Sequence, residues 1–215
     1  MSTLLVPDWP APARIAAGTT TVATADSELP GGIRYLRQVH GVTVTTAADV
    51  RAAGAPIEAD AVVGSERGDV CAICTADCLP VLFCARDASA VGAAHAGWRG
   101  LAAGVLENTV AAMAAPAAQL LAWIGPGISQ ANFEVGDEVR AAFLAADAGA
   151  EGHFRRNHRG RWQADLSAIA RQRLAAAGVG AVFGGKWCTY GDPGRFFSYR
   201  RDPGCGRLVS FILLK

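Results

Sequence analysis

The sequence has little net charge, few charged residues and no long apolar run. Its 20 basic and 19 acidic side chains leave a net charge of +1, so it lacks the basic surface of a general nucleic-acid-binding protein. The 51% hydrophobic content excludes intrinsic disorder, yet no apolar run approaches the roughly 20 residues that cross a bilayer. Residues 1–11 contain Asp8 and two prolines, which a signal peptide avoids. We expect a cytoplasmic chain that forms one domain over residues 1–215, without nucleic-acid or membrane partners.

Histidine and methionine are also scarce, with 4 and 2 residues respectively. A trinuclear copper cluster is built largely from imidazoles, and four histidines cannot supply them, so this count excludes a multicopper oxidase. A blue-copper site usually adds an axial methionine. The two methionines are Met1 and Met113, and the second lies in a predicted helix.

Four of the six cysteines lie within residues 71–84. This segment is apolar and strand-like, so we expect reduced thiols that serve packing or metal binding rather than disulfides. Cys71 and Cys74, followed by Cys78 and Cys84, suggest a structural zinc cluster as an alternative. In an extended strand, however, residues three positions apart face opposite sides, and no turn separates Cys71 from Cys74. We therefore interpret Cys71 and Cys74 as small core residues.

The hydrophobic pattern predicts many strands and few helices. Helices are expected over residues 101–114, 135–147 and 165–177, the last with Asp165 as N-cap and Gly178 as its stop. The basic stretch 153–161 is interpreted as a solvated loop. Strands are expected over 13–24, 35–46 (two segments meeting at His40-Gly41), 59–64, 70–75, 80–84, 90–95, 120–125, 188–190, 196–200 and 207–214. Strict β-α-β alternation is absent, which favours a layered α/β or α+β fold over a Rossmann sheet.

Three side chains of the types that commonly bind metals stand at the ends of predicted strands, each beside glycine or proline. They are His40, Cys78 and His95. Strand ends commonly present side chains to a cleft, and two imidazoles with one thiolate match a catalytic zinc site with an open fourth position. The same residues also fit a metal-free cysteine hydrolase, with Cys78 as nucleophile and His95 as base. Spacing alone leaves both alternatives open, together with purely structural roles.

The blocks around these residues resemble the signature blocks of the YfiH family, also called the laccase-domain or polyphenol-oxidase family. They read Gln38-Val39-His40-Gly41, Thr75-Ala76-Asp77-Cys78-Leu79-Pro80 and His95-Ala96-Gly97-Trp98-Arg99-Gly100. Further matching blocks follow in order at 124–126, 133–136, 188–189, 198–201 and 206–207, so the resemblance covers roughly residues 33–214.

The resemblance implies a layered α/β/β/α sandwich with mixed sheets. It also implies zinc, favoured over copper, held by His40, Cys78 and His95. The implied activity is phosphorolysis of adenosine, inosine, guanosine and methylthioadenosine, with an adenosine deaminase activity. The implied partners are a purine nucleoside and phosphate. Some bacterial members are instead assigned to editing a peptidoglycan precursor.

The N-terminal segment departs from the family pattern. Members usually carry Thr-Thr-Arg and a glycine-rich loop, whereas residues 19–24 here contain no arginine and the connection to Gln38 is short. This departure affects the expected nucleoside specificity more than the expected metal binding, and it leaves a non-catalytic binding protein as a further alternative.

Four more residues are candidates for the site. Asp77 is expected to accept a proton or to orient Cys78, and Gln38 to bind substrate or to support His40. Arg99 stands beside a predicted helix start and Arg200 follows an aromatic strand, so both are candidates for phosphate binding. Surface or ion-pair roles are the alternative for each arginine.

Overall fold

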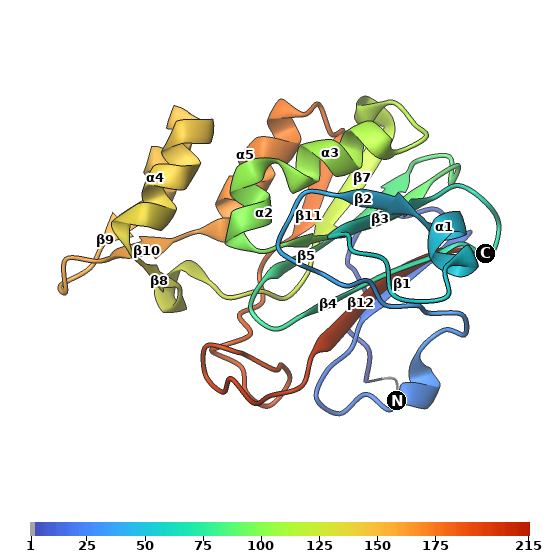
Figure 1. Ribbon diagram of the computed structural model, residues 1–215, viewed down its shortest axis with the longest axis horizontal. Coiled ribbons are helices and arrows are strands. Elements are labelled where there is room, and N and C mark those ends of the chain that lie inside the picture. Colours follow the sequence, from blue (N-terminus) through green and yellow to red (C-terminus); the bar gives the residue numbers. More distant parts are fainter. Residues whose placement is uncertain (1–2) are drawn as a thin grey trace.

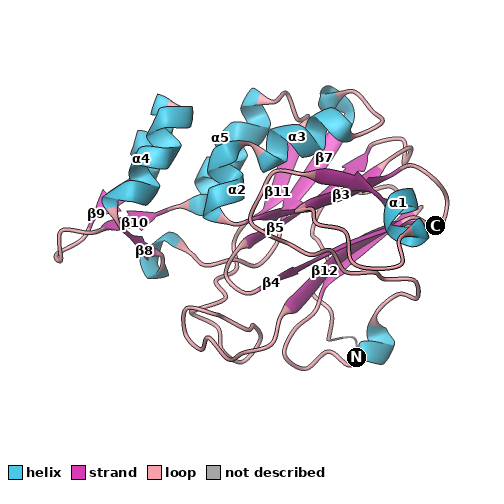
Figure 2. Ribbon diagram, in the orientation of Figure 1, coloured by secondary structure: helices cyan, strands magenta, loops and turns pink. Residues whose placement is uncertain are grey.

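A six-stranded mixed sheet forms the centre of the molecule in the computed structural model, which describes residues 3–215 (Figure 1, Figure 2). Its strands are β2 (Val44–Thr46), β3 (Ala61–Gly64), β5 (Leu79–Ala85), β6 (Val91–Ala96), β7 (Leu120–Ile124) and β11 (Ala181–Gly184). They follow the order β11-β7-β5-β6-β3-β2, with parallel pairs at both ends and antiparallel pairs between them. Every residue of β5, β6 and β7 is buried, because these apolar strands are covered on both faces.

A three-stranded antiparallel sheet packs against one face of the central sheet. It consists of β1 (Ile15–Thr19), β12 (Leu208–Leu214) and β4 (Val70–Thr75), in the order β1-β12-β4. Side chains alternate along β4, so Cys71 and Ile73 point into the cluster between the two sheets, whereas Ala72 and Cys74 lie in a cluster on the outer face. Cys71 and Cys74 thus face opposite sides, as predicted.

The helices described within residues 3–215 are α1 (Ala47–Ala52), α2 (Trp98–Ala103), α3 (Val105–Ala112), α4 (Asp137–Ala146) and α5 (Leu166–Ala176). Of these, α2, α3 and α5 cover the other face of the central sheet, whereas Ala47 and Val50 of α1 belong to the cluster between the two sheets. Leu101, Leu106 and Leu174, from α2, α3 and α5, belong to the same buried cluster as Phe83 of β5. Figure 1 shows these three helices beside the central sheet. Asp165 caps α5 by accepting the backbone N–H of Ala168, as predicted. None of these helices is long and apolar enough to cross a membrane.

Smaller elements complete the fold. A second three-stranded sheet contains β8 (Glu134–Val135), β9 (Phe154–Arg156) and β10 (Trp162–Ala164), and it lies with α4 at one end of the molecule (Figure 1). The short 3₁₀ helices are η1 (Asp26–Glu28), η2 (Ala117–Gln119), η3 (Gln130–Asn132) and η4 (Ala148–His153). The stretch 153–161, predicted as a solvated loop, therefore contributes strand β9 to this sheet and connects it to β10.

The layered α/β class with mixed sheets is confirmed, and so is the absence of a Rossmann arrangement. The layer outside the three-stranded sheet, where the predicted α/β/β/α sandwich has helices, is thinner than a layer of helices. Leu29 and Ile33, beside η1, cover Phe211 of β12, so this layer is a loop with one short 3₁₀ helix.

Further sequence predictions differ from the observed elements. The helix predicted over 101–114 starts at Trp98 and is divided into α2 and α3 by Gly104, whose φ of 105° lies in the left-handed region. The strands predicted over 188–190 and 196–200 do not form. The Arg201 guanidinium donates to the carbonyls of Thr189, Tyr190 and Phe196, so a side chain rather than a neighbouring strand satisfies them. The strands predicted over 13–24 and 35–46 shrink to β1 and β2.

Candidate metal centre

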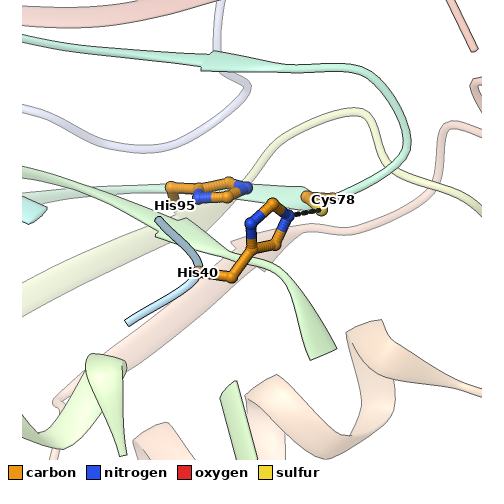
Figure 3. A group of neighbouring side chains, drawn as sticks. All are labelled: His40, Cys78 and His95. Carbon is orange, nitrogen blue, oxygen red and sulfur yellow. Dashed lines mark hydrogen bonds between the residues drawn. The ribbon is translucent and has the colours of Figure 1, made fainter. Parts of the chain in front are cut away.

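The structure brings the three predicted metal ligands together (Figure 3). His40 lies in the turn before β2, Cys78 in the turn before β5 and His95 near the end of β6. Their ligand atoms all lie within 4.8 Å of one another, and Cys78 Sγ is 3.8 Å from His40 Nε2. The two imidazole rings meet edge to face, with centroids 4.8 Å apart. Among the described residues, this is the group of histidine, cysteine and carboxylate side chains suited to hold a metal ion.

A buried carboxylate, Asp60, joins the two histidine segments. Its side chain is 0% exposed. One oxygen, Oδ1, accepts the backbone N–H of His40 at 2.9 Å and lies 2.8 Å from His95 Nδ1. The other oxygen accepts the N–H groups of Val39 and Gly41 at 3.2 and 2.7 Å. A proton on His95 Nδ1 donates to Asp60 and leaves Nε2 as the ligand atom, which is how metal-binding histidines are commonly oriented.

The local backbone is specialised around the ligands. His40 has a φ of 61°, in the left-handed region, and the hydrogen bonds to Asp60 hold it there. Gly97 leaves the space that the ligands occupy, because a Cβ at this position would stand 2.7 Å from His40 Cδ2 and 3.0 Å from Cys78 Sγ. The glycine in the third signature block is therefore needed for packing against the site.

The electrostatic surroundings favour a thiolate. Burial opposes ionisation of Cys78, but hydrogen bonds and charge from His40 and His95 outweigh it and lower the pKa of the thiol to about 7. Burial also acts to lower the pKa of His95, whereas Asp60 and Cys78 raise this pKa to about 9. Desolvation acts to raise the pKa of Asp60, yet its hydrogen bonds hold that pKa below the usual value. A soft metal ion needs such an anionic sulfur.

The ligands line a cavity of about 530 Å³, which we call the metal cavity. Its lining residues are Leu36, Gln38, His40, Cys74, Thr75, Ala76, Cys78, His95, Tyr199 and Arg207. Gln38 lies on this wall, but its amide is engaged: Nε2 donates to the carbonyl of Cys74 and Oε1 accepts its N–H, both at 2.8 Å. Gln38 thus fastens the segment before His40 to the end of β4.

Asp77 adopts a φ of 87° directly before Cys78. Its carboxylate accepts the Thr189 hydroxyl and the backbone N–H of Arg200, both at 2.6 Å. These bonds fasten the Cys78 turn to the loop that contains Arg200. Asp77 does not belong to the group of converging ligand atoms.

Arg99 and Arg200 do not line the metal cavity but meet at a second cavity of about 330 Å³, which we call the arginine cavity. Its lining residues are Trp98, Arg99, Phe133, Glu134, Val135, Gly136, Glu138, Val139, Arg161 and Arg200. The Arg99 guanidinium lies 4.3 Å from the centroid of the Trp98 ring, and that of Arg200 lies 5.3 Å from Phe133. Arg200 Nη1 also donates to the carbonyl of Glu134.

Sequence reasoning missed Asp60, Thr75, Tyr199 and Arg207 as individual site residues. The last three stand inside or beside the signature blocks. Asp60 stands between two alanines, outside the signature blocks. The only sequence signal for its role is its place directly before an apolar strand, because a carboxylate buried there requires hydrogen-bond partners.

The fold and the His-Cys-His group define a layered α/β protein with a cavity lined by three residues that could hold a metal ion, and comparisons with known proteins specify its family. The family model described as multicopper polyphenol oxidoreductase laccase matches residues 10–215. The chain therefore belongs to this laccase-like family, and the predicted resemblance to YfiH is confirmed.

Relatives match along the whole chain. It is 44% identical to a protein of Pseudomonas aeruginosa named purine nucleoside phosphorylase, and 44% identical to the Escherichia coli purine nucleoside phosphorylase YfiH, with 100% of each chain covered. The alignment with the Pseudomonas protein spans 245 positions against the 215 residues of this chain, so that relative carries residues that this chain lacks.

Solved structures agree with this relationship. A Neisseria meningitidis protein matches with a TM-score of 0.91 at 41% identity over 100% of both chains. The Bacillus licheniformis protein YfiH, described as hypothetical, matches with a TM-score of 0.87 at 27% identity, over 100% of this chain and 97% of the other.

Proposed function

We propose that this protein is a zinc-dependent purine nucleoside phosphorylase that acts on adenosine, inosine, guanosine and methylthioadenosine, with an adenosine deaminase activity. The observation that carries the proposal is the convergence of His40, Cys78 and His95 at one cavity. The names of relatives that are 44% identical over their whole length support a phosphorylase-type enzyme.

The donor set supports zinc more strongly than copper. Two imidazoles and one thiolate form the three-ligand set of a catalytic zinc site. Met113 is buried in the helix-side core beside Gly92 and is not among the residues that line the metal cavity, so it does not supply the axial ligand of a blue-copper site. When bound, zinc would polarise the substrate or lower the pKa of a water molecule.

The protein groups have separable roles in the proposed reaction. Asp60 fixes the ring of His95 and the backbone of His40, and Asp77 orients Cys78 by holding its turn against the loop at Arg200. The metal cavity receives the nucleoside. Arg99 and Arg200 bind the phosphate that attacks the C1′ carbon as the purine leaves.

Residues that are neighbours in the chain line the two cavities. Tyr199 lines the metal cavity and Arg200, the next residue, lines the arginine cavity. Gly97 contacts the ligands, and Trp98 beside it lines the arginine cavity. The segments that carry the ligands therefore also carry residues of the arginine cavity, which supports one active site made of both cavities.

The test combines metal analysis with product analysis. Protein purified without added metal is expected to contain about one zinc per chain. Incubation with each nucleoside should release the free base and ribose 1-phosphate only when phosphate is present, and adenosine should also yield inosine. Copper in place of zinc would contradict the metal assignment, and a zinc-loaded sample that converts no nucleoside would contradict the function.

A metal-free cysteine hydrolase is a second candidate, favoured by the lowered pKa of Cys78 beside His95. It predicts hydrolytic activity in protein from which a chelator has removed all metal. Loss of every activity with the metal, and its recovery with added zinc, would exclude this candidate.

A further inference from the structure

The hydroxyl of Thr75 is buried without a hydrogen-bond partner among residues 3–215. Thr75 is 2% exposed, ends β4 and lines the metal cavity. The buried hydroxyl of Thr109, in contrast, donates to the carbonyl of Val105 at 2.6 Å. A buried hydroxyl without a partner destabilises a folded protein, so in a residue that lines a cavity it indicates a group that a ligand completes.

The positions of Thr75 and His95 place them on facing sides of the two sheets. Along β4, Cys71 and Ile73 point toward the central sheet, and Thr75 continues that alternation. Along β6, Val91 and Ala93 point toward the small sheet, and His95 continues theirs. Thr75 and His95 therefore enter the space between the sheets from opposite sides, at the end where both line the metal cavity.

An aromatic ring lies on the same cavity wall. Leu208 of β12 pairs with Thr75, so Arg207 stands one residue before the position opposite Thr75. The Arg207 guanidinium lies 5.7 Å from the centroid of the Tyr199 ring, and its Nη1 donates to the carbonyls of Cys205 and Gly206. Tyr199 is 53% exposed and lines the cavity. A half-exposed ring with a cation at its side is a stacking platform for a planar base.

We propose that Thr75 and Tyr199 recognise the nucleoside. The Thr75 hydroxyl hydrogen-bonds a ribose hydroxyl, and the Tyr199 ring, held in position by the Arg207 guanidinium, stacks on the purine. This inference rests on the proposed function and names the substrate contacts of the same site. A threonine hydroxyl both donates and accepts, which matches a ribose hydroxyl. The ribose also carries the bond that phosphorolysis breaks, so it must lie beside the metal ligands. Phosphate is matched instead by the guanidinium groups of the arginine cavity.

The first test is Thr75→Val, which removes the hydroxyl and keeps the shape. The KM for inosine should rise about tenfold, the KM for phosphate should stay unchanged and the zinc content should stay unchanged. The melting temperature should not fall, because the lost hydroxyl has no partner in the protein. Thr109→Val serves as the matched control and should leave both KM values unchanged. A lower melting temperature with wild-type KM values would make Thr75 a structural residue and overturn the proposal.

The second test uses 2′-deoxyinosine and 3′-deoxyinosine. The penalty of Thr75→Val should disappear for the analogue that lacks the contacted hydroxyl, whereas Tyr199→Ala should weaken all three substrates about equally. A Thr75→Val penalty of the same size on inosine and both analogues would overturn the ribose contact, as would a rise in the phosphate KM instead. If wild-type protein neither binds nor converts inosine, the proposed function itself fails and this inference fails with it. Normal wild-type turnover with an unaffected Thr75→Val variant rejects this inference alone.

Discussion

The metal cavity and the arginine cavity hold their functional groups in opposite ways. In the metal cavity, His95 is buried and Asp60 bonds both histidine segments, and Gly97 leaves the space in which His40 and Cys78 fit. In the arginine cavity, Arg99 and Arg200 are exposed and rest on aromatic rings. One site is fixed by packing and buried hydrogen bonds, and the other by contacts that solvent and salt weaken.

This difference predicts how each site responds to substitution. Ligand geometry that depends on close packing fails when one atom is added or one buried partner is changed. An exposed guanidinium contributes to binding by degrees, since neighbouring charges and solvent replace part of its effect. Substitutions of the metal ligands and of their buried partners should therefore produce larger effects than substitutions in the arginine cavity.

The largest effect is expected for Cys78→Ser, which should abolish metal retention and nucleoside turnover together. A serine hydroxyl does not provide the thiolate that zinc prefers. Elemental analysis and activity of the same sample measure both losses. Cys71→Ser and Cys74→Ser are the controls and should keep the metal, because neither thiol belongs to the converging group of ligand atoms, although Cys74 lines the metal cavity. Equal metal loss from Cys71→Ser would indicate a cysteine cluster instead.

The acidity of Cys78 gives the next largest effect. In metal-free protein its pKa is lowered to about 7 from an ordinary value of 9.0, so the thiolate is present above about pH 7 and is lost as the pH falls through that value. At pH 6 this corresponds to about a hundredfold more thiolate than an ordinary cysteine has. The rate at which Cys78 is alkylated as a function of pH, with the modified site identified by peptide mapping, measures this pKa.

His40→Ala should move this alkylation midpoint upward, because it removes one of the two imidazoles that lower the pKa. Cys84, whose pKa burial raises to about 12, provides an internal control that should stay unmodified. A midpoint near 9 for Cys78 in the wild-type protein would contradict the electrostatic description of the site.

Asp60→Asn should weaken zinc binding about tenfold to hundredfold, the range found when the partner of a metal-binding histidine is changed. The amide cannot supply the charge that orients His95, and its NH₂ group opposes the N–H donors of residues 39–41. Competition with a chelator measures the affinity. Asp69→Asn is the matched control: Asp69 is also buried and accepts the N–H groups of Ser65 and Glu66, but it lies outside the metal cavity. If both variants lost stability and neither lost zinc affinity, Asp60 would be purely structural.

The contrast between ligands and supporting residues also explains what the sequence could predict. His40, Cys78 and His95 each stand in a short block at a strand end beside glycine or proline, and the resemblance of these blocks to the YfiH family indicates the ligand set that spacing alone leaves open. Asp60 acquires its role only when three separate segments meet around it, so no local pattern contains that information. Thr75 opens a signature block, but nothing in that block shows that its hydroxyl is buried without a partner in the folded protein.

The secondary structure follows the same rule. The strands β5, β6 and β7 are predictable because an uninterrupted apolar run must be buried on both faces. The segment between Cys188 and Arg200 is not predictable, since its backbone is held by the side chain of Asp77, which is remote in sequence, and by that of Arg201, which directly follows the segment. Arg99 and Arg200 were expected at a phosphate site, but only the fold reveals that they share a cavity separate from the metal ligands.

Gly97→Ala tests the packing of the metal cavity with one added carbon atom. Gly97 has a φ of −65°, which alanine adopts without strain, so the effect should come from the contacts of the new Cβ with His40 and Cys78. We expect about a tenfold loss of zinc affinity. Gly152→Ala, where a Cβ meets nothing within 4 Å, should bind zinc like the wild type. Unchanged affinity in Gly97→Ala would mean that the ligand turns adapt, which would remove the contrast with the arginine cavity.

The smallest effect is expected in the arginine cavity. Arg99→Ala and Arg200→Ala should each raise the KM for phosphate about fivefold to tenfold, with little change in the KM for the nucleoside, because an exposed guanidinium chiefly contributes a screened charge and hydrogen bonds to the anion. The zinc content should stay unchanged, since neither residue lines the metal cavity. Raising the ionic strength should shrink the difference from wild type, whereas the losses in Cys78→Ser and Gly97→Ala should not depend on salt. Arg67→Ala, at an exposed position outside both cavities, controls for the general loss of one positive charge. If Arg99→Ala and Arg200→Ala behaved like Arg67→Ala, phosphate would have to bind elsewhere, and the two cavities would not form one active site.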